Sequence, residues 1–124
     1  MKSNLKFKFN AGFVENKSMK LLVNQQSVDV SEHFIVNISV ELPTEINFEL
    51  SGKLPSDTVV KNGKIIADKF IQLDEIEIDE FKIFPYQIPE KYLATNYWGK
   101  NGLVKFIIDQ DDPALWLLEC PGII

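Results

Sequence analysis

The residues best suited to chemistry are aromatic and lie in the last third of the chain. Tyr92, Tyr97 and Trp98 fall in or beside a stretch without a regular strand pattern, and Asn101 follows closely. A flat ring in a loop-lined cleft can stack on the apolar face of a sugar, while an amide can hydrogen-bond the sugar hydroxyls. Tyr92, Tyr97, Trp98 and Asn101 are therefore the candidate ligand-binding residues, and Tyr86 is a further aromatic residue of the same stretch. The alternative is packing in the core, which is what we expect of Trp116 in its apolar run.

Acidic residues form a second candidate site. Five carboxylates fall within the seven residues from Asp74 to Glu80, and Asp109, Asp111 and Asp112 share one loop. Calcium takes about six to eight oxygen ligands, which an Asp-rich turn can help to supply. We therefore name Asp109, Asp111 and Asp112 as candidate calcium ligands, although their spacing matches no EF-hand loop. The alternative is that these runs are solvated turns that keep the protein soluble.

Catalysis has little support in the sequence. His33 is the single histidine and Cys120 the single cysteine, and Cys120 has no cationic neighbour that would favour its thiolate. The sequence contains no Gly-rich phosphate loop, no His-Glu-x-x-His and no Gly-x-Ser-x-Gly. A pair of carboxylates that meet in space, as glycoside hydrolysis requires, stays open. We expect a protein that is not an enzyme.

Composition excludes several classes of partner. The 124 residues carry a formal net charge of −5, and all 13 basic residues are Lys. An acidic chain without Arg repels nucleic-acid phosphates, so we expect no nucleic-acid partner. One cysteine cannot form an intrachain disulfide. No apolar run approaches the roughly 20 residues of a membrane span and no signal sequence is evident, so we expect no membrane partner and synthesis in the cytoplasm.

Alternating apolar residues predict the elements that must position these side chains. The alternation is regular from Phe34 to Leu42, and again from Ile46 to Leu50. It indicates half-buried strands. We expect these two strands to pair antiparallel, with Pro43 in the turn between them. Further strands are expected around Leu5–Phe9, Met19–Val23, Ile71–Ile78 and Val104–Ile108.

Turn signals complete the pattern. Asn62-Gly63 between β-branched pairs predicts a type I′ hairpin, and Asp79-Glu80 favours a second tight hairpin. Leu73 and Ile76 lie on opposite parities, so the strand needs a bulge or turn at Asp74–Glu75. From Pro85 to Asn96 we expect an extended loop. The sequence thus predicts one all-β domain over residues 1–124, an antiparallel β-sandwich of jelly-roll type with about eight to ten short strands.

The apolar run from Ala114 to Leu118 predicts a last strand, and Ile123 and Ile124 leave an apolar tail. Strands that lack partners favour contact with other subunits. We therefore expect a non-catalytic binding module, foremost a structural or accessory subunit of a homo- or hetero-oligomeric assembly such as a phage or virus particle. One alternative is a calcium-assisted carbohydrate-binding module with a glycan partner. Another is a small acidic inhibitor or immunity-type protein.

Overall fold

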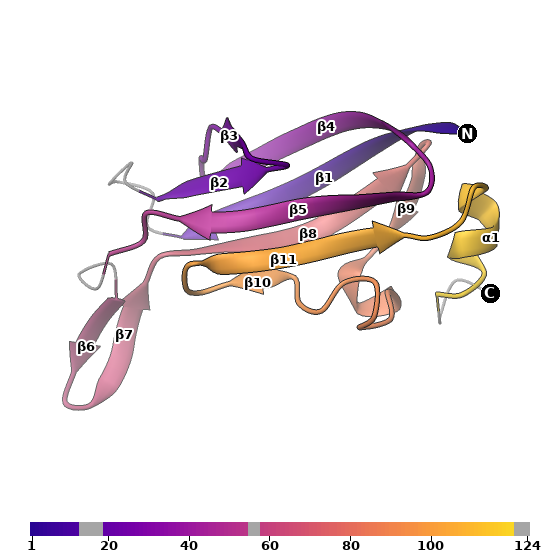
Figure 1. Cartoon of the computed structure of the whole chain (residues 1–124). Coiled ribbons are helices and arrows are strands. Elements are labelled where there is room, and N and C mark those ends of the chain that lie inside the picture. The colour runs from indigo at the N-terminus through magenta and orange to yellow at the C-terminus, as the bar shows by residue number, and fades with distance from the viewer. Residues whose placement is uncertain (13–18, 55–57, 121–124) are drawn as a thin grey trace.

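Two antiparallel sheets pack face to face in the computed structural model, which describes residues 1–12, 19–54 and 58–120 (Figure 1). Sheet A has the strand order β10-β8-β1-β4, and β9 pairs with β8. Sheet B has the order β11-β5-β2-β3. Sheet A consists of β1 (Lys2–Gly12), β4 (His33–Glu41), β8 (Phe70–Ile78), β9 (Phe81–Ile83) and β10 (Tyr97–Trp98). Sheet B consists of β2 (Lys20–Val23), β3 (Gln26–Val28), β5 (Thr44–Ser51) and β11 (Gly102–Ile108).

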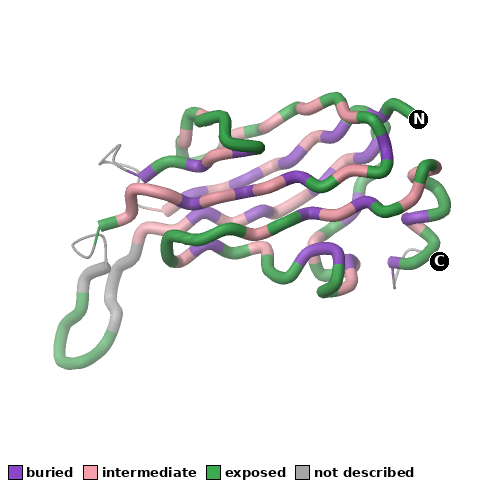
Figure 2. The backbone as a smooth tube through the Cα atoms, viewed as in Figure 1, coloured by how far each residue is buried: buried purple, intermediate pink, exposed green. Residues whose placement is uncertain are grey.

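The core lies between the sheets and follows from the alternation in the sequence. Every second residue of β1 and β5 is buried, as the alternating colours of Figure 2 show. Phe7 of sheet A meets Phe48 of sheet B edge to face at 4.9 Å between ring centroids, and Phe106 joins them. Burial of such large rings supplies much of the free energy that holds two sheets together. The predicted antiparallel β-sandwich is thus confirmed, with eleven strands among the described residues.

Two of the predicted tight turns occupy the left-handed region of backbone conformation. Asn62 and Gly63 join β6 (Thr58–Lys61) to β7 (Lys64–Asp68) with φ values of 53° and 75°, which confirms the predicted hairpin. That hairpin forms its own sheet and projects from one end of the sandwich (Figure 1). Asp79 and Glu80 join β8 to β9 with φ values of 48° and 72°, which confirms the second hairpin. The Asp79 carboxylate holds this turn by accepting bonds from Ser3 Oγ at 2.7 Å and the Asn4 N–H at 2.8 Å.

Two expectations about the strands are wrong. β4 and β5 do not pair: β4 pairs with β1, and β5 pairs with β2 and β11. The chain crosses from sheet A to sheet B at the buried Leu42. The apolar faces of β4 and β5 therefore meet the same core from opposite sides. The run from Ala114 to Leu118 is not a strand either, since Pro113–Leu117 forms the helix α1.

Asp112 explains the start of α1. Its carboxylate accepts a bond from the Ala114 N–H at 2.9 Å, and Pro113 occupies the first turn. Both are typical helix-start features. Trp116 belongs to this helix, and its side chain is fully buried and packs on Phe106. None of the described helices is long and apolar enough to cross a membrane. The tail of Ile123 and Ile124 lies outside the described residues.

Candidate functional site

A β-bulge in β8 places two consecutive carboxylates on the outer face of sheet A, the face turned away from sheet B. Lys8 of β1 is opposite Glu75, but Phe9 is opposite Leu73, so Asp74 is the extra residue. The bulge lets Leu73 and Ile76 both enter the core despite their opposite parity. It confirms the irregularity that the sequence predicts here.

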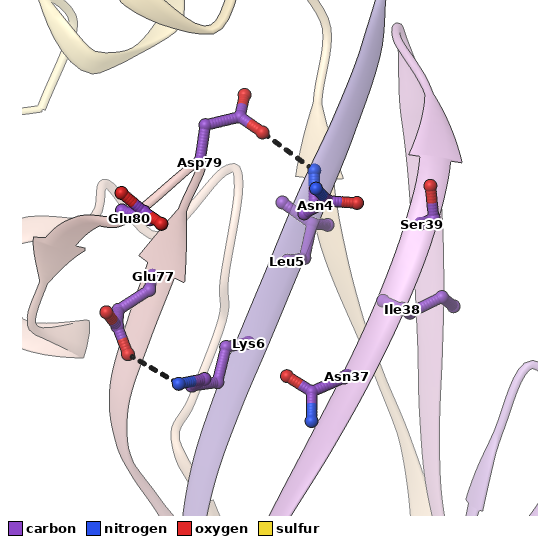
Figure 3. Close-up of a pocket in the computed structure, with 9 residues that line it drawn as sticks. All are labelled: Asn4, Leu5, Lys6, Asn37, Ile38, Ser39, Glu77, Asp79 and Glu80. Carbon is purple, nitrogen blue, oxygen red and sulfur yellow. Dashed lines mark hydrogen bonds and ion pairs between the residues drawn. The ribbon is translucent and has the colours of Figure 1, made fainter.

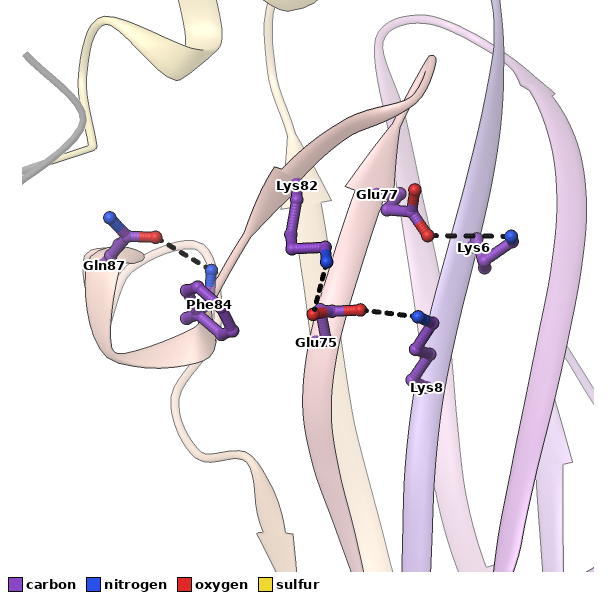
Figure 4. A network of polar contacts seen from close by, with 7 residues as sticks. All are labelled: Lys6, Lys8, Glu75, Glu77, Lys82, Phe84 and Gln87. Carbon is purple, nitrogen blue, oxygen red and sulfur yellow. Dashed lines mark hydrogen bonds and ion pairs between the residues drawn. The ribbon is translucent and has the colours of Figure 1, made fainter.

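The two carboxylates of the bulge have different partners. Asp74 accepts a hydrogen bond from Asn10 Nδ2 at 2.7 Å. Glu75 lies between Lys8 Nζ at 2.9 Å and Lys82 Nζ at 3.2 Å (Figure 4). The hydrogen bond from Lys8 is the main reason that the pKa of Glu75 lies below its usual value, and the same contact raises the pKa of Lys8. Two lysines thus pair with Glu75, whereas the partner of the Asp74 carboxylate is the uncharged amide of Asn10.

The chain that leaves β9 carries an exposed aromatic pair. The 3₁₀ helix η2 (Pro85–Gln87) begins after Phe84, and the Phe84 N–H donates to Gln87 Oε1 at 2.9 Å (Figure 4). The Gln87 N–H donates back to the Phe84 carbonyl at 2.9 Å. These bonds fix the turn that presents Tyr86, which is 82% exposed. Its ring stacks on that of Phe84, with centroids 5.7 Å apart and planes only 6° from parallel.

A hollow of about 500 Å³ lies beside this pair. Its lining combines the two rings with polar side chains from β8 and from the loop before β10, among them Gln72, Asp74, Glu90 and Asn96. Asn96 is held in place because its Nδ2 donates to the Leu73 carbonyl at 2.9 Å. Flat apolar surface next to a few fixed polar groups is the usual make-up of a small-molecule site. We take this aromatic hollow as the candidate site.

A larger hollow of about 630 Å³ lies further along the outer face of sheet A (Figure 3). Its lining contains no aromatic residue. Three of its charged groups already have partners, since Lys6 Nζ lies 3.6 Å from Glu77 Oε2 and Asp79 accepts from the Asn4 N–H. A ligand would have to break these contacts, so this hollow is the weaker candidate.

Two of the predicted ligand residues are core residues. Trp98 is 2% exposed, and its Nε1 donates to the Phe48 carbonyl at 3.3 Å. It points inward because it pairs with the buried Ile71 across the sheet. Tyr92 is also buried, and its hydroxyl donates to Glu119. That bond, together with burial, raises the pKa of Tyr92. Burial leaves little of either ring open to a ligand, so ligand binding by Tyr92 and Trp98 stays a prediction.

The other two predicted ligand residues lie at the surface. Tyr97 pairs with Gln72, so its ring points to the outer face of sheet A, where it is 43% exposed. Asn101 bonds the backbone of Lys53 twice, with its Oδ1 accepting at 3.0 Å and its Nδ2 donating at 3.1 Å. Asn101 therefore ties two loops together. Tyr97, Trp98 and Asn101 do line one hollow of about 400 Å³, and Tyr92 is not part of it.

The acidic loop shows no sign of a metal centre. Asp112 caps α1, and Asp109 is among the charges that raise the pKa of Tyr92. Within residues 1–12, 19–54 and 58–120, no three His, Cys, Asp or Glu side chains come together in a way that could hold a metal ion. Asp109, Asp111 and Asp112 therefore do not form such a group, and their role as calcium ligands stays a prediction.

The two residues considered for nucleophilic catalysis have ordinary roles. Cys120 is buried, and its Sγ donates to the Trp116 carbonyl at 3.8 Å. Burial raises the pKa of the Cys120 thiol to about 11, so it carries no thiolate at neutral pH. His33 is exposed at the start of β4 and lines a hollow that shares Asp74 and Phe84 with the candidate site.

Sequence reasoning missed Phe84 and Tyr86 as a pair. Two signals were available in the sequence Phe84-Pro85-Tyr86. Proline favours the first turn of a helix, and a ring on either side of such a turn can face its neighbour. Asp74 could also have been found, because the parity switch that requires a bulge requires an extra outward side chain.

Comparison with known proteins was made at the level of sequence and of structure. No protein-family description matches the sequence, and no curated protein matches it. One similar solved structure is the selenomethionine form of vCBM60, one of the calcium-dependent carbohydrate-binding modules whose two families are linked by circular permutation. The TM-score is 0.50 at 11% identity, over 85% of this chain and 90% of that chain. The complex of vCBM60 with galactobiose gives 0.46 at 13% identity, over 84% and 97%. At this identity the likeness concerns the β-sandwich fold alone.

Proposed function

We propose that the protein is a non-catalytic glycan-binding module that stacks a sugar ring on Tyr86. The observation that carries the proposal is the exposed, parallel pair of Phe84 and Tyr86 beside a hollow with polar walls. The carbon–hydrogen face of a sugar is apolar, so stacking on a ring removes apolar surface from water. A fully exposed tyrosine held by a hydrogen-bonded turn is ready for such contact without rearrangement.

The polar walls suit the rim of a sugar. Asp74 accepts hydrogen bonds from hydroxyl groups, and Asn10 already fixes its orientation at 2.7 Å. Gln72 and Asn96 offer both donors and acceptors. A sugar carries donors and acceptors around an apolar face, and the hollow presents the complementary arrangement.

The likeness to vCBM60 supports a glycan-binding role because that sandwich is a carbohydrate-binding module. The likeness is one of fold, so the residues of this chain must bear the proposal. The proposal assigns no residue to calcium, because no three described His, Cys, Asp or Glu side chains come together.

The other interpretations have less support. The interpretation as a subunit of a larger assembly rested partly on an unpaired strand from Ala114 to Leu118. Most of that segment belongs to helix α1 instead. The inhibitor interpretation rested on acidic runs, of which Glu75 is already paired with two lysines. We therefore prefer the glycan to a protein as partner.

Affinity electrophoresis in gels that contain galactan, xylan, glucomannan or mixed-linkage β-glucan tests the proposal. At least one of these polymers should retard the wild-type protein. Tyr86→Ala should weaken the retardation roughly tenfold or more, the effect of removing one stacking ring. Tyr86→Phe, which keeps the ring, should retain most of it.

Leu115→Ala is the matched control, because Leu115 is also an exposed apolar residue but belongs to α1. This variant should bind like the wild type. All variants should melt within a few degrees of each other, because the substituted side chains are exposed. No retention by any polymer, or equal retention of wild type and Tyr86→Ala, would contradict the proposal.

A further inference from the structure

A second aromatic pair lies on the same outer face of sheet A. The rings of Phe70 and Tyr97 stack with centroids 5.4 Å apart and planes 26° from parallel. Phe70 belongs to β8 and Tyr97 to β10, so the pair sits on strands and not on a loop. Neither residue is used by the site described above.

Two glycines hold this pair in place. A Cβ at Gly12 would lie 2.4 Å from Phe70 Cε1, and a Cβ at Gly99 would lie 2.7 Å from Tyr97 Cε1. Each ring therefore lies close against glycine backbone, and a Cβ at either glycine would force the ring to shift. The Lys53 Nζ also donates to the Gly99 carbonyl, which helps to fix the loop below Tyr97. The rings form a preformed platform, which lowers the entropic cost of binding.

The second pair is continuous with the candidate site. Tyr97 lies directly opposite Gln72 in the strand register, and Gln72 lines the hollow beside Tyr86. Thr95 lines both that hollow and the one beside Tyr97. Along β8, Phe70 and Asp74 are four residues apart, which corresponds to about 13 Å. That span exceeds a single sugar ring.

We propose that the ligand is an extended oligosaccharide or polysaccharide chain that contacts both aromatic pairs. One sugar unit stacks on Tyr86, and a more distant sugar unit of the same chain stacks on Tyr97. This inference rests on the proposed glycan-binding function and adds the class of ligand. Gln72 and Asn96, which line the hollow beside Tyr86, contact the intervening sugar. A monosaccharide or chain end would occupy only one platform.

Calorimetric titration with a length series of the retained polymer tests the inference. Oligosaccharides of one to six units should bind the wild type with rising affinity. The gain between two and about five units should be roughly tenfold or more, because the second ring then becomes occupied. An affinity that stays flat beyond two units would overturn the inference.

Tyr97→Ala should remove this gain and leave the affinity for the disaccharide within about twofold. Tyr97→Leu, which keeps an apolar side chain over Phe70, should behave in the same way and guards against loss of folding. Equal weakening at every length, or no weakening, would overturn the inference. If Tyr86→Ala leaves all lengths unaffected, the proposed function itself fails; if only the length dependence is missing, the proposed function stands and the two-platform inference falls.

Discussion

Two aromatic pairs from the last third of the sequence have opposite surroundings. Phe84 and Tyr86 stack on the outside of sheet A, with Tyr86 82% exposed. Tyr92 and Trp116 meet at 5.4 Å in the core, where Trp116 is fully buried. The first pair sits on a short turn that Gln87 holds, and Tyr86 keeps most of its surface open to solvent.

The pair of Tyr92 and Trp116 is enclosed by contacts with strand β11 and helix α1. Leu93 forms a β-bridge with Phe106, and the Tyr92 carbonyl accepts from the Ile107 N–H at 2.9 Å. Helix α1 then lays Trp116 over the same strand. The comparison teaches that an aromatic residue does not by itself mark a ligand-binding site. The backbone that carries each ring decides whether the ring stabilises the fold or can meet a ligand.

The largest expected effect comes from the buried pair. Trp116→Ala should lower the free energy of unfolding by about 3–5 kcal/mol, because it removes a large ring and leaves a cavity. Tyr86→Ala should lower it by less than about 0.5 kcal/mol. Chemical denaturation of both variants measures the difference. Similar losses in the two variants would break the distinction between a structural and a binding pair.

A smaller effect is expected at the start of α1. Asp112→Ala removes the cap and should lower the free energy of unfolding by about 1 kcal/mol. The loss should be the same with added calcium and with EDTA, and glycan retention should not change. A calcium-dependent stability that disappears in Asp112→Ala would instead show that the loop binds metal.

The smallest expected effects concern the pH dependence of stability. Glu75 on the outer face of sheet A should matter at acid pH, and Tyr92 in the core should matter at alkaline pH. Lys8 holds the pKa of Glu75 below its ordinary 4.5, so this contact stabilises the fold above that pH and is lost as the pH falls. Glu75→Gln should flatten the acid side of the stability profile. The pKa of Tyr92 is raised above its ordinary 10.0, so its contribution is present below pH 10 and is lost as the pH rises further.

Tyr92→Phe should therefore flatten the alkaline side and leave the acid side unchanged. Thermal melting between about pH 3 and pH 11 measures both profiles. If Glu75→Gln altered only the alkaline side, the Lys8–Glu75 contact would not be the cause.

Much of the fold follows from the sequence because one face of each strand is apolar. The alternation predicts β1, β4, β5 and β11, and it predicts the bulge in β8. Alternation says which side chains enter the core but not which sheet a strand joins, so the pairing of β4 with β5 was wrong. The helix α1 has only five residues, too few for a helical period to appear, and its start signal at Asp112-Pro113 was the better guide.

The site was harder to predict for a related reason. Tyr97 and Trp98 are adjacent, yet one faces out and the other in, because they lie opposite Gln72 and Ile71. A strand of two residues gives no pattern from which to read this. Tyr86 lies in a proline-bounded turn, where the exposure of a ring depends on the neighbouring strands.

The most direct test of glycan binding at Tyr86 is a map of backbone amide shifts by nuclear magnetic resonance while the retained oligosaccharide is added. Glycan binding at Tyr86 predicts the largest shifts at Phe84, Tyr86 and Gln87 and at Gln72 to Asp74, with little change at Tyr92 or around Asp109 to Asp112. Shifts that cluster in the Asp109 to Asp112 loop, with none near Tyr86, would contradict it.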